Sequence, residues 1–335
     1  MKAVVLHDAG RLAVEDWPRP AAKDGELLLR LRGCGLCGSD LAKIGGPITK
    51  PIVLGHELVG DVVAVGADVA DFSVGDRVVA AHHVPCDTCH YCRRGSSSMC
   101  RAFKASNLDP GGFAEYVRVP DANVRHATFR IPPHVSDEAA SFVEPLACCA
   151  RAVRRAHVQP GDTAVVIGLG SIGCLFVQLF RLAGALVVGV DPVAERATLA
   201  KQLGAEVTGP EVAARTSVME LTDGRGADHV LITGGGADVL PWAVDAARDG
   251  GTIHYFAGGG GSALPVSLAT LYHRELTLTT TYSSSPADLA EAFQLVTSGR
   301  VVVSALITHR LPLASLADAV DLMRRRAALK VFVTP

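Results

Sequence analysis

The chain has 335 residues, 49% of them hydrophobic, and its 32 basic and 34 acidic side chains leave a net charge of −2. This length predicts two domains, and the balanced charge argues against a nucleic-acid partner because no basic surplus is present to bind a phosphate backbone. At the N-terminus, His7 and Asp8 interrupt the apolar segment that a secretory signal requires. Nine cysteines without such a signal favour metal or thiol chemistry in a reducing compartment. We therefore expect a cytoplasmic protein with no membrane partner.

The first 125 residues are predicted to be rich in β-strands. Short apolar runs at 27–31, 58–65 and 77–81 lie between glycine, proline and aspartate residues, which mark turns.

From about residue 160 the pattern changes to alternating strands and helices. We expect strands at 163–167, 186–190, 228–233 and 252–257, and helices after the glycine turn at 168–173 and at 193–203 and 239–247. Strands that alternate with crossover helices specify a doubly wound parallel sheet with helices on both faces, an α/β fold. The glycine run 258–261 is interpreted as a mobile loop. Helices at 287–297 and 316–325 and a strand at 330–334 follow, and their periodicity does not indicate which domain they join.

Four cysteines form a C-x2-C-x2-C-x7-C pattern within fifteen residues: Cys86, Cys89, Cys92 and Cys100. Four thiolates so close in sequence can enclose one tetrahedral zinc ion and leave no open position for a substrate. An iron–sulfur cluster or disulfides are the alternatives. However, the spacing differs from the ferredoxin pattern, and the compartment disfavours disulfides. We predict a structural zinc lobe at about 84–102.

A second group of metal-ligand types is spread more widely, over Cys37, His56, Glu57 and Glu144. A thiolate, an imidazole and a carboxylate are typical of a catalytic zinc site that keeps its fourth position open. Each signal is weak alone, because His56 can be an ordinary buried histidine and Cys37 a small core residue. Cys34 and Cys37 also form a C-x2-C pair, but no thioredoxin-like context follows it.

A G-x-G-x-x-G string connects a predicted strand to a predicted helix, and its residues are Gly168, Gly170, Ser171, Ile172 and Gly173, with Leu169 between the first two. Asp191 follows the next strand, 18 residues after Gly173, at the spacing of the dinucleotide-binding fingerprint. The glycines let a pyrophosphate approach the helix N-terminus. A carboxylate at Asp191 accepts hydrogen bonds from the adenosine ribose and repels a 2′-phosphate, which predicts NAD rather than NADP. The alternative is an incidental glycine turn.

Together and in this order, these motifs closely resemble the zinc-dependent medium-chain alcohol dehydrogenase family over essentially the whole chain. The resemblance includes GHELVG at 55–60, GDRV at 75–78 and GGFAEY at 111–116. Glu144-Pro145-Leu146 stands where the ethanol-type enzymes carry a cysteine ligand, which is similar to the sorbitol, threonine and glucose dehydrogenase branch.

The resemblance implies a GroES-like β-rich catalytic domain at 1–146 into which a Rossmann domain at 147–282 is inserted. The segment 283–335 then completes the catalytic domain, and the substrate binds between the two domains. It further implies a homodimer, formed by the strand near 275–282, or a homotetramer.

The resemblance also implies residue roles. Cys37 and His56 would bind the catalytic zinc with either Glu57 or Glu144, and Asp40 would hold the His56 imidazole. Ser39 would pass the substrate proton to the cofactor ribose, and Ala42 stands where many relatives carry the next histidine of the relay. We therefore expect the proton to leave through ribose-bound water or Glu57. The cofactor contacts implied in the second domain are Arg196, Thr280 and Thr281.

The predicted function is a reversible, NAD-linked oxidation of a secondary alcohol to a ketone, with two zinc ions per subunit. The branch implies a polyol, a sugar or an amino alcohol as the small-molecule substrate. A zinc-stabilised NAD-binding protein without turnover, structural or sensing, is the alternative. The intact set of Cys37, His56 and Glu144 argues against it.

Overall fold

Residues 1–257 and 264–335 are described in the computed structural model, so the predicted loop at 258–261 lies outside the described residues. The chain divides into two units. One contains residues 1–147 and 284–335, and the other contains residues 148–283. Among the described residues, no helix has the length and apolar character needed to cross a membrane.

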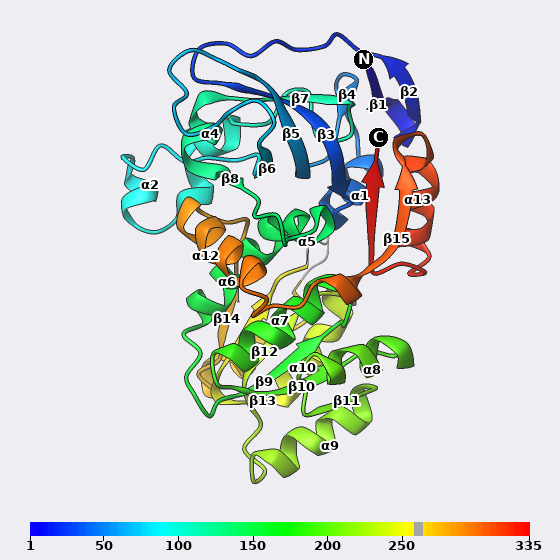
Figure 1. The fold of residues 1–335 in the computed structure, drawn as a ribbon. Coiled ribbons are helices and arrows are strands. Elements are labelled where there is room, and N and C mark those ends of the chain that lie inside the picture. Colours follow the sequence, from blue (N-terminus) through cyan, green and yellow to red (C-terminus); the bar gives the residue numbers. More distant parts are fainter. Residues whose placement is uncertain (258–263) are drawn as a thin grey trace. The chain divides into compact units, whose positions relative to one another are not determined.

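The first unit is built on a seven-stranded sheet in the order β15-β16-β3-β5-β6-β8, with β7 also paired to β3 (Figure 1). Its strands are β3 (Leu27–Gly35), β5 (Glu57–Val65), β6 (Arg77–Ala80), β7 (Tyr116–Val119), β8 (Thr128–Arg130), β15 (Ile307–Pro312) and β16 (Lys330–Thr334). A smaller sheet pairs β2 (Leu12–Asp16), β1 (Lys2–Leu6) and β4 (Ile52–Val53). The predicted runs at 27–31, 58–65 and 77–81 fall on β3, β5 and β6.

The C-terminal segment belongs to this first unit. Strand β16 pairs antiparallel with β3, placing Phe332 opposite Gly35 and Val333 opposite Cys34. The last residues of the chain therefore lie beside the strand that leads to Cys37.

Short helices connect the strands of the first unit. They are α1 (Gly38–Ile44), α2 (His90–Arg93), α3 (Arg101–Ala105), α4 (Asp121–Ala127), α5 (Asp137–Ser141), α12 (Pro286–Thr297) and α13 (Leu316–Arg324). Helix α6 (Val143–Ala156) begins in this unit and continues past residue 147.

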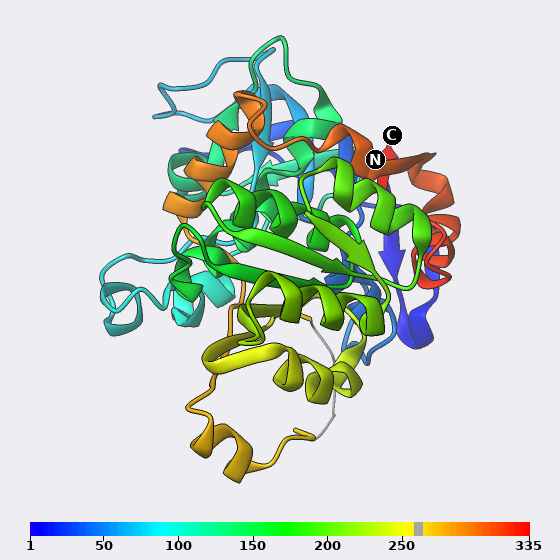
Figure 2. The ribbon, with the colours of Figure 1, turned by 90° about the horizontal axis from the view of Figure 1, so that it is seen from below.

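The second unit contains a six-stranded sheet in the order β11-β10-β9-β12-β13-β14, and all its strand pairs are parallel. The strands are β9 (Thr163–Ile167), β10 (Leu186–Val190), β11 (Val207–Gly209), β12 (Ala227–Ile232), β13 (Ala247–Tyr255) and β14 (Thr277–Thr280). Its helices are α7 (Ser171–Leu182), α8 (Ala194–Gln202), α9 (Glu211–Leu221), α10 (Leu240–Ala246) and α11 (Leu268–His273). Helices lie on both sides of the green strands β9 and β10 in Figure 2, as a doubly wound fold requires.

The sequence analysis did not predict β11 and α9. Strand β11 has three residues, all of them half-buried, and it gives too short an apolar run to be recognised. Strand β13 begins at Ala247, five residues before the predicted start, and its pairing with β12 shifts register between Ala227 and His229.

Candidate functional site

The four sulfur atoms of the predicted structural zinc lobe converge. The Sγ atoms of Cys86, Cys89, Cys92 and Cys100 lie within 4.8 Å of one another. The sulfur atoms of Cys89 and Cys92 are 3.5 Å apart, and those of Cys86 and Cys100 are 3.6 Å apart. The short helices α2 and α3 begin directly after Cys89 and Cys100, so the chain turns at the ligand positions.

The charges of these thiols explain why a cation fits them. A hydrogen bond from Thr88 lowers the pKa of the Cys86 thiol to about 6. Burial raises the pKa of the Cys92 thiol to about 12, and the neighbouring thiols add to this rise. Several thiolates repel one another at such distances unless a metal ion neutralises them. Four sulfur donors with no other donor type are the set that structural zinc prefers.

Helix α1 positions the first residues of the predicted catalytic set. Cys37 caps its N-terminus, and the Asp40 carboxylate accepts a hydrogen bond from the Cys37 backbone N–H at 3.2 Å. The Ser39 hydroxyl lies 3.4 Å from Cys37 Sγ and 3.4 Å from His56 Nε2. One turn of helix therefore places a sulfur, a hydroxyl and a carboxylate around one imidazole.

His56 directly precedes β5 and is buried. Its Nδ1 atom is 3.4 Å from Asp40 Oδ1, so Asp40 holds the proton on Nδ1 and leaves Nε2 as the lone-pair donor. Burial opposes a charge on this ring. The carboxylate of Asp40 and the thiolate of Cys37 outweigh burial and hold the pKa of His56 well above its ordinary value. A bound cation would replace this proton.

Glu57 follows His56 on β5, with its side chain 1% exposed. Ligand atoms of Cys37, His56 and Glu57 lie within 4.8 Å of one another. Gly35 makes room for the carboxylate, because a Cβ atom at that position would overlap a Glu57 oxygen. Sulfur, nitrogen and oxygen donors in one buried group fit a zinc ion with an open position.

Lys330 is a site residue that the sequence analysis missed. Its Nζ atom donates to both Glu57 oxygens, at 2.8 and 2.7 Å, and its side chain is 3% exposed. Burial lowers the pKa of Lys330, but the Glu57 charge raises it further, and the net shift is upward. No local motif marks a single lysine on a terminal strand, so no sequence signal identified it.

Glu144, in the first turn of α6, is buried nearby. Its Oε1 atom lies 3.9 Å from Nδ1 of His82, whose ring centroid is 4.6 Å from that of His56. His82 was also missed, although it lies in the His82-His83 pair just before the cysteine cluster. Burial, with help from the positive charges of His56 and His83, holds the pKa of His82 well below its ordinary value.

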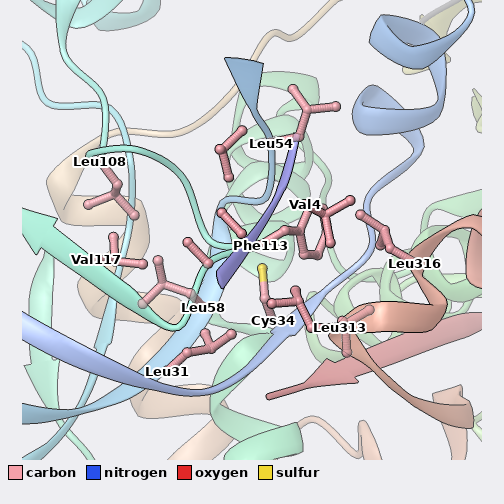
Figure 3. Close-up of a cluster of buried hydrophobic side chains, with 14 of the residues drawn as sticks. Val4, Leu31, Cys34, Leu54, Leu58, Leu108, Phe113, Val117, Leu313 and Leu316 are labelled. Atoms are coloured by element: carbon pink, nitrogen blue, oxygen red, sulfur yellow. The ribbon is translucent and has the colours of Figure 1, made fainter. Parts of the chain in front are cut away.

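Cys34 lies apart from the candidate ligand set. Its side chain is fully buried, and Figure 3 shows its sulfur among apolar side chains that include Phe113 and Leu313. Burial raises the pKa of this thiol, which makes it unreactive. Cys34 is therefore a packing residue of the first unit.

The glycine turn of the second unit has the backbone that the fingerprint requires. Gly168 has a φ of +88°, and a Cβ atom at Gly173 would overlap the Gly168 carbonyl oxygen. A Cβ atom at Gly170 would meet nothing within 4 Å, so the space over the α7 N-terminus is open. Ser171 and Ile172 form the first turn of α7. This cradle fits a pyrophosphate at the helix N-terminus.

Asp191 follows β10 at the same end of the sheet and is 5% exposed. Its two oxygens accept hydrogen bonds from the backbone N–H groups of Leu169, at 2.8 Å, and Val193, at 2.9 Å. An Arg196 nitrogen lies 3.9 Å from the carboxylate. Asp191, a predicted ribose contact, is therefore hydrogen-bonded to Leu169 of the glycine turn.

Thr280 and Thr281 lie at and just after the carboxyl end of β14, the edge strand of the parallel sheet. Thr280 is exposed. The Thr281 hydroxyl oxygen is buried and has no hydrogen-bond partner among the described residues. The carboxyl ends of β9, β10 and β14 face the same side, where a doubly wound sheet binds its ligand.

Comparison with known proteins agrees with this geometry. Residues 23–131 match the alcohol dehydrogenase GroES-like domain, and residues 171–298 match the zinc-binding dehydrogenase family. The chain is 31% identical to a sorbitol dehydrogenase of Halalkalibacterium halodurans, over 100% of this chain and 99% of that protein.

Solved structures show the same similarity. Alcohol dehydrogenase TADH from Thermus sp. ATN1 superposes with a TM-score of 0.88 at 31% identity, covering 100% of this chain and 99% of that one. A putative zinc-binding dehydrogenase from Sinorhizobium meliloti 1021, bound to NADP, has a TM-score of 0.88 at 30% identity, with the same coverage of both chains.

The chain therefore belongs to the zinc-dependent medium-chain alcohol dehydrogenase family, in the branch similar to sorbitol dehydrogenase. Within that family it is an alcohol dehydrogenase that uses zinc and a nicotinamide dinucleotide and acts on a small-molecule alcohol. The predicted fold class, a Rossmann sheet with a GroES-like domain, is confirmed. The alternative of an NAD-binding protein without turnover is not favoured.

Proposed function

We propose that this enzyme oxidises a secondary hydroxyl of a polyol, a sugar or an amino alcohol to the ketone, reversibly and with NAD. The observation that carries this proposal is the convergence of Cys37, His56 and Glu57 within 4.8 Å, with the Ser39 hydroxyl in reach of two of them. The similarity to a sorbitol dehydrogenase over the full chain supports a polyol.

We propose two zinc ions per subunit, one held by the four-cysteine cluster and one by Cys37, His56 and a carboxylate. When bound, the second ion supplies Lewis acidity to the alcohol oxygen, while NAD accepts the hydride. Asp40 faces Nδ1 of His56, so the ring presents Nε2 on the side of Ser39, where a bound ion would replace the proton. The four-cysteine set leaves no open ligand position, so its role is to stabilise the lobe.

Two carboxylates are candidates for the direct ligand. Glu57 lies closer to Cys37 and His56, but both its oxygens are paired with Lys330. Glu144 Oε1 lies 3.9 Å from Nδ1 of His82, the ring beside His56. The zinc contents of Glu57→Gln and Glu144→Gln distinguish the two, because losing the direct ligand removes one ion per subunit.

Ser39 is the proposed proton carrier. Its hydroxyl reaches both Cys37 Sγ and His56 Nε2, so it can take the proton of a substrate hydroxyl held beside them. Ala42, one turn further along α1, has no side chain that accepts a proton. Because Lys330 holds both Glu57 oxygens, exit through ribose-bound water is favoured over exit through Glu57.

For the cofactor we propose that NAD is preferred to NADP. Asp191 presents a buried carboxylate at the end of β10, and a 2′-phosphate there would meet its negative charge. Gly168, Gly170 and Gly173 hold the pyrophosphate turn. Arg196 would contact the ribose, and Thr280 and Thr281 would contact the nicotinamide.

A homodimer or homotetramer is also proposed, with β14 as the pairing edge. This strand ends the parallel sheet, and Tyr272 on the preceding helix is 78% exposed. The nine free cysteines support a reducing, cytoplasmic location. Light scattering of the purified protein measures the subunit number.

A panel of polyols, sugars, amino alcohols and simple secondary alcohols, followed by NADH absorbance, tests the proposal. We expect turnover of a polyol or amino alcohol with NAD and a kcat/KM at least tenfold lower with NADP. The His56→Ala variant is the matched control for zinc-dependent turnover. If the protein holds two zinc ions and binds NAD but oxidises none of the panel, the proposed substrate class is wrong.

A further inference from the structure

The loop at 109–113 contacts the chain just before His56. The backbone N–H of Gly112 donates to the Gly55 carbonyl oxygen at 2.8 Å. Gly55 directly precedes the candidate zinc ligand His56. The GGFAEY motif at 111–116 therefore begins in direct backbone contact with the segment that carries this ligand.

Gly55 and Gly112 lie too close together for a side chain on either residue. Gly55 has a φ of +92°, and a Cβ atom there would lie 2.9 Å from the Phe113 nitrogen. A Cβ atom at Gly112 would lie 2.8 Å from Cys34 Sγ and 3.1 Å from the Gly55 carbonyl carbon. Because no side chain separates the two backbone segments, a displacement of one moves the other.

The backbone of Gly55 is held at both of its polar groups. Its N–H donates to Asp40 Oδ1 at 3.4 Å, and its carbonyl oxygen accepts from Gly112. The same Asp40 oxygen lies 3.4 Å from Nδ1 of His56. One carboxylate oxygen thus faces both the His56 ring and the backbone before it. A shift of Gly55 would therefore move the imidazole relative to Cys37.

An ion-pair network anchors the loop to the sheet of the first unit. The Arg118 guanidinium, on β7, donates to the Asp109 carboxylate at 3.0 Å and to both Glu26 oxygens at 3.0 Å. Backbone hydrogen bonds also join Asp109 and Arg118 in both directions, at 3.1 and 2.8 Å. Glu26 is 8% exposed, so its charge requires a partner. Arg118 therefore fixes the first residue of the loop against β7.

We propose that the loop 109–113 positions His56 for zinc, with Gly112 as the contact and Arg118 as the anchor. This inference rests on the proposed zinc ion of Cys37, His56 and a carboxylate, called the second site below. Gly112 and Arg118 are positioning residues, because neither belongs to the set of candidate ligands. Altering a group that orients a metal ligand commonly lowers metal affinity by about 10- to 100-fold.

The first variant, Gly112→Ala, places a methyl group against Cys34 Sγ and the Gly55 carbonyl. We expect zinc to bind the second site about tenfold or more weakly, while the four-cysteine set keeps its ion. Zinc content after dialysis against zinc-buffered solutions measures both affinities. The double variant Gly112→Ala/Cys34→Ala removes the sulfur, so the methyl group can move away from Gly55 and part of the affinity should return. Cys34→Ala alone is the control and should weaken zinc binding less than Gly112→Ala does.

The second variant, Arg118→Met, tests the anchor without adding an atom near Gly55. We expect it also to weaken zinc binding at the second site and to spare the four-cysteine set. Arg118→Lys keeps a positive charge but cannot bridge two carboxylates with a planar fork, so it should recover part of the loss. The matched control is Arg30→Met, which removes an exposed arginine paired with Asp61 on the same sheet and should leave zinc affinity unchanged. Should Gly112→Ala fail to fold, Arg118→Met and Arg118→Lys decide the question in the same way.

Cobalt in place of zinc gives a readout that a loss of stability alone would not change. The absorption bands of cobalt at the second site should shift in Gly112→Ala and Arg118→Met, because the imidazole has moved. The thiolate-to-cobalt bands of the four-cysteine set should stay as they are in the unaltered protein.

Contrary results separate this inference from the proposed function. A lower Tm in Gly112→Ala and Arg118→Met with unchanged zinc affinity and cobalt bands would overturn the inference, because the loop would then only stabilise the unit. Equal weakening at both zinc sites would overturn it too, and in both cases the proposed function would stand. An unaltered protein that takes up only one zinc ion at saturating zinc would overturn the proposed second site and this inference with it.

Discussion

Lys330 and Glu57 form a buried ion pair between the last strand of the chain, β16, and strand β5, which begins at the candidate zinc ligand Glu57. The lysine nitrogen lies 2.7 and 2.8 Å from the two carboxylate oxygens, and the side chains are 3% and 1% exposed. The residues are 273 positions apart in the sequence. The same nitrogen donates to the Leu36 carbonyl oxygen at 3.3 Å, next to Cys37. The C-terminal strand therefore stabilises a negative charge at the candidate site.

Removing one partner of this pair leaves the other charge buried and unpaired. We expect Lys330→Met to lower the free energy of unfolding by about 3–5 kcal/mol, measured by urea denaturation of the zinc-loaded protein. The double variant Lys330→Met/Glu57→Gln should recover part of the loss, since no charge is left without a partner. The exposed Lys43→Met is the control and should change stability by less than about 0.5 kcal/mol. Equal stability of Lys330→Met and Lys43→Met would contradict the role of the pair.

The two candidate zinc sites should respond differently to the loss of one ligand. Cys100→Ser removes a ligand of the closed four-sulfur set, whose binding energy contributes to folding. We expect it to lose one zinc ion and to lower the Tm by about 5 °C or more. His56→Ala should lose the other ion and all turnover, while its Tm and NADH affinity stay close to those of the unaltered enzyme.

Cys34→Ala is the matched control for these two variants. It removes a buried sulfur outside both sets, so it should lower the Tm by lost packing and keep two zinc ions. Interchangeable effects of Cys100→Ser and His56→Ala on Tm and turnover would refute the division into structural and catalytic metal.

Two glycines of the cofactor turn are required for different reasons. At Gly173 an added methyl group would overlap the Gly168 carbonyl oxygen. We expect Gly173→Ala to destabilise the second unit by about 1–3 kcal/mol. At Gly170 the added methyl would meet no protein atom within 4 Å, so Gly170→Ala should keep its Tm and bind NADH at least about tenfold more weakly. Thermal unfolding and NADH fluorescence titration measure the two effects. Tight NADH binding by Gly170→Ala would show that the pyrophosphate does not approach this turn.

The Ser39 hydroxyl is expected to carry the substrate proton. Ser39→Ala should lower kcat about 10²-fold, the usual scale for a positioned proton-transfer group, with two zinc ions retained. Ala42→His should raise the rate near neutral pH if proton exit limits turnover, because it adds an acceptor one turn along α1. Steady-state kinetics across pH 6–9 check both variants. Full activity of Ser39→Ala would show that water does this work and that the relay is wrong.

His254 on β13 should make the second unit sensitive to acid. It is 3% exposed, and neither ring nitrogen has a hydrogen-bond partner among the described residues. Burial, with a smaller effect of Arg155, lowers the pKa of His254 to about 4. The unfolded chain takes up a proton near pH 6.5, so stability is lost as the pH falls from about 6.5 towards 4.

Once the pH is below both of these pKa values, the free energy of unfolding is about 3 kcal/mol lower than at neutral pH. We expect the stability difference between His254→Leu and the unaltered protein to shift in favour of the variant as the pH falls from 7 to 4.5. His273→Leu, an exposed position in the same unit, should show no such shift. Urea denaturation at several pH values measures the free energy of unfolding of the unaltered protein and of both variants. Parallel pH profiles for His254→Leu and the unaltered protein would contradict the prediction.

Patterns of residues close together in the sequence were enough to predict the four-cysteine cluster, the glycine turn and strand β9. The four cysteines lie within fifteen residues, so any compact folding brings their sulfur atoms near one another. The G-x-G-x-x-G string between a strand and a helix likewise specifies its own turn. Strand β9 was predicted at its observed bounds because a β-branched run ending in glycine is a local signal.

Only the tertiary structure decided the contacts between distant segments. The predicted strand at 330–334 could have joined either domain, and pairing of β16 with β3 assigns it to the first. That pairing brings Lys330 to Glu57, and the same packing buries Cys34 in the core while Cys37, three residues later, faces His56. The side-chain pattern of a segment specifies its own period and which of its faces is apolar. Which distant segment covers that face depends on the packing of the whole unit, so the neighbours of Glu57 and of His82 could not be read along the chain.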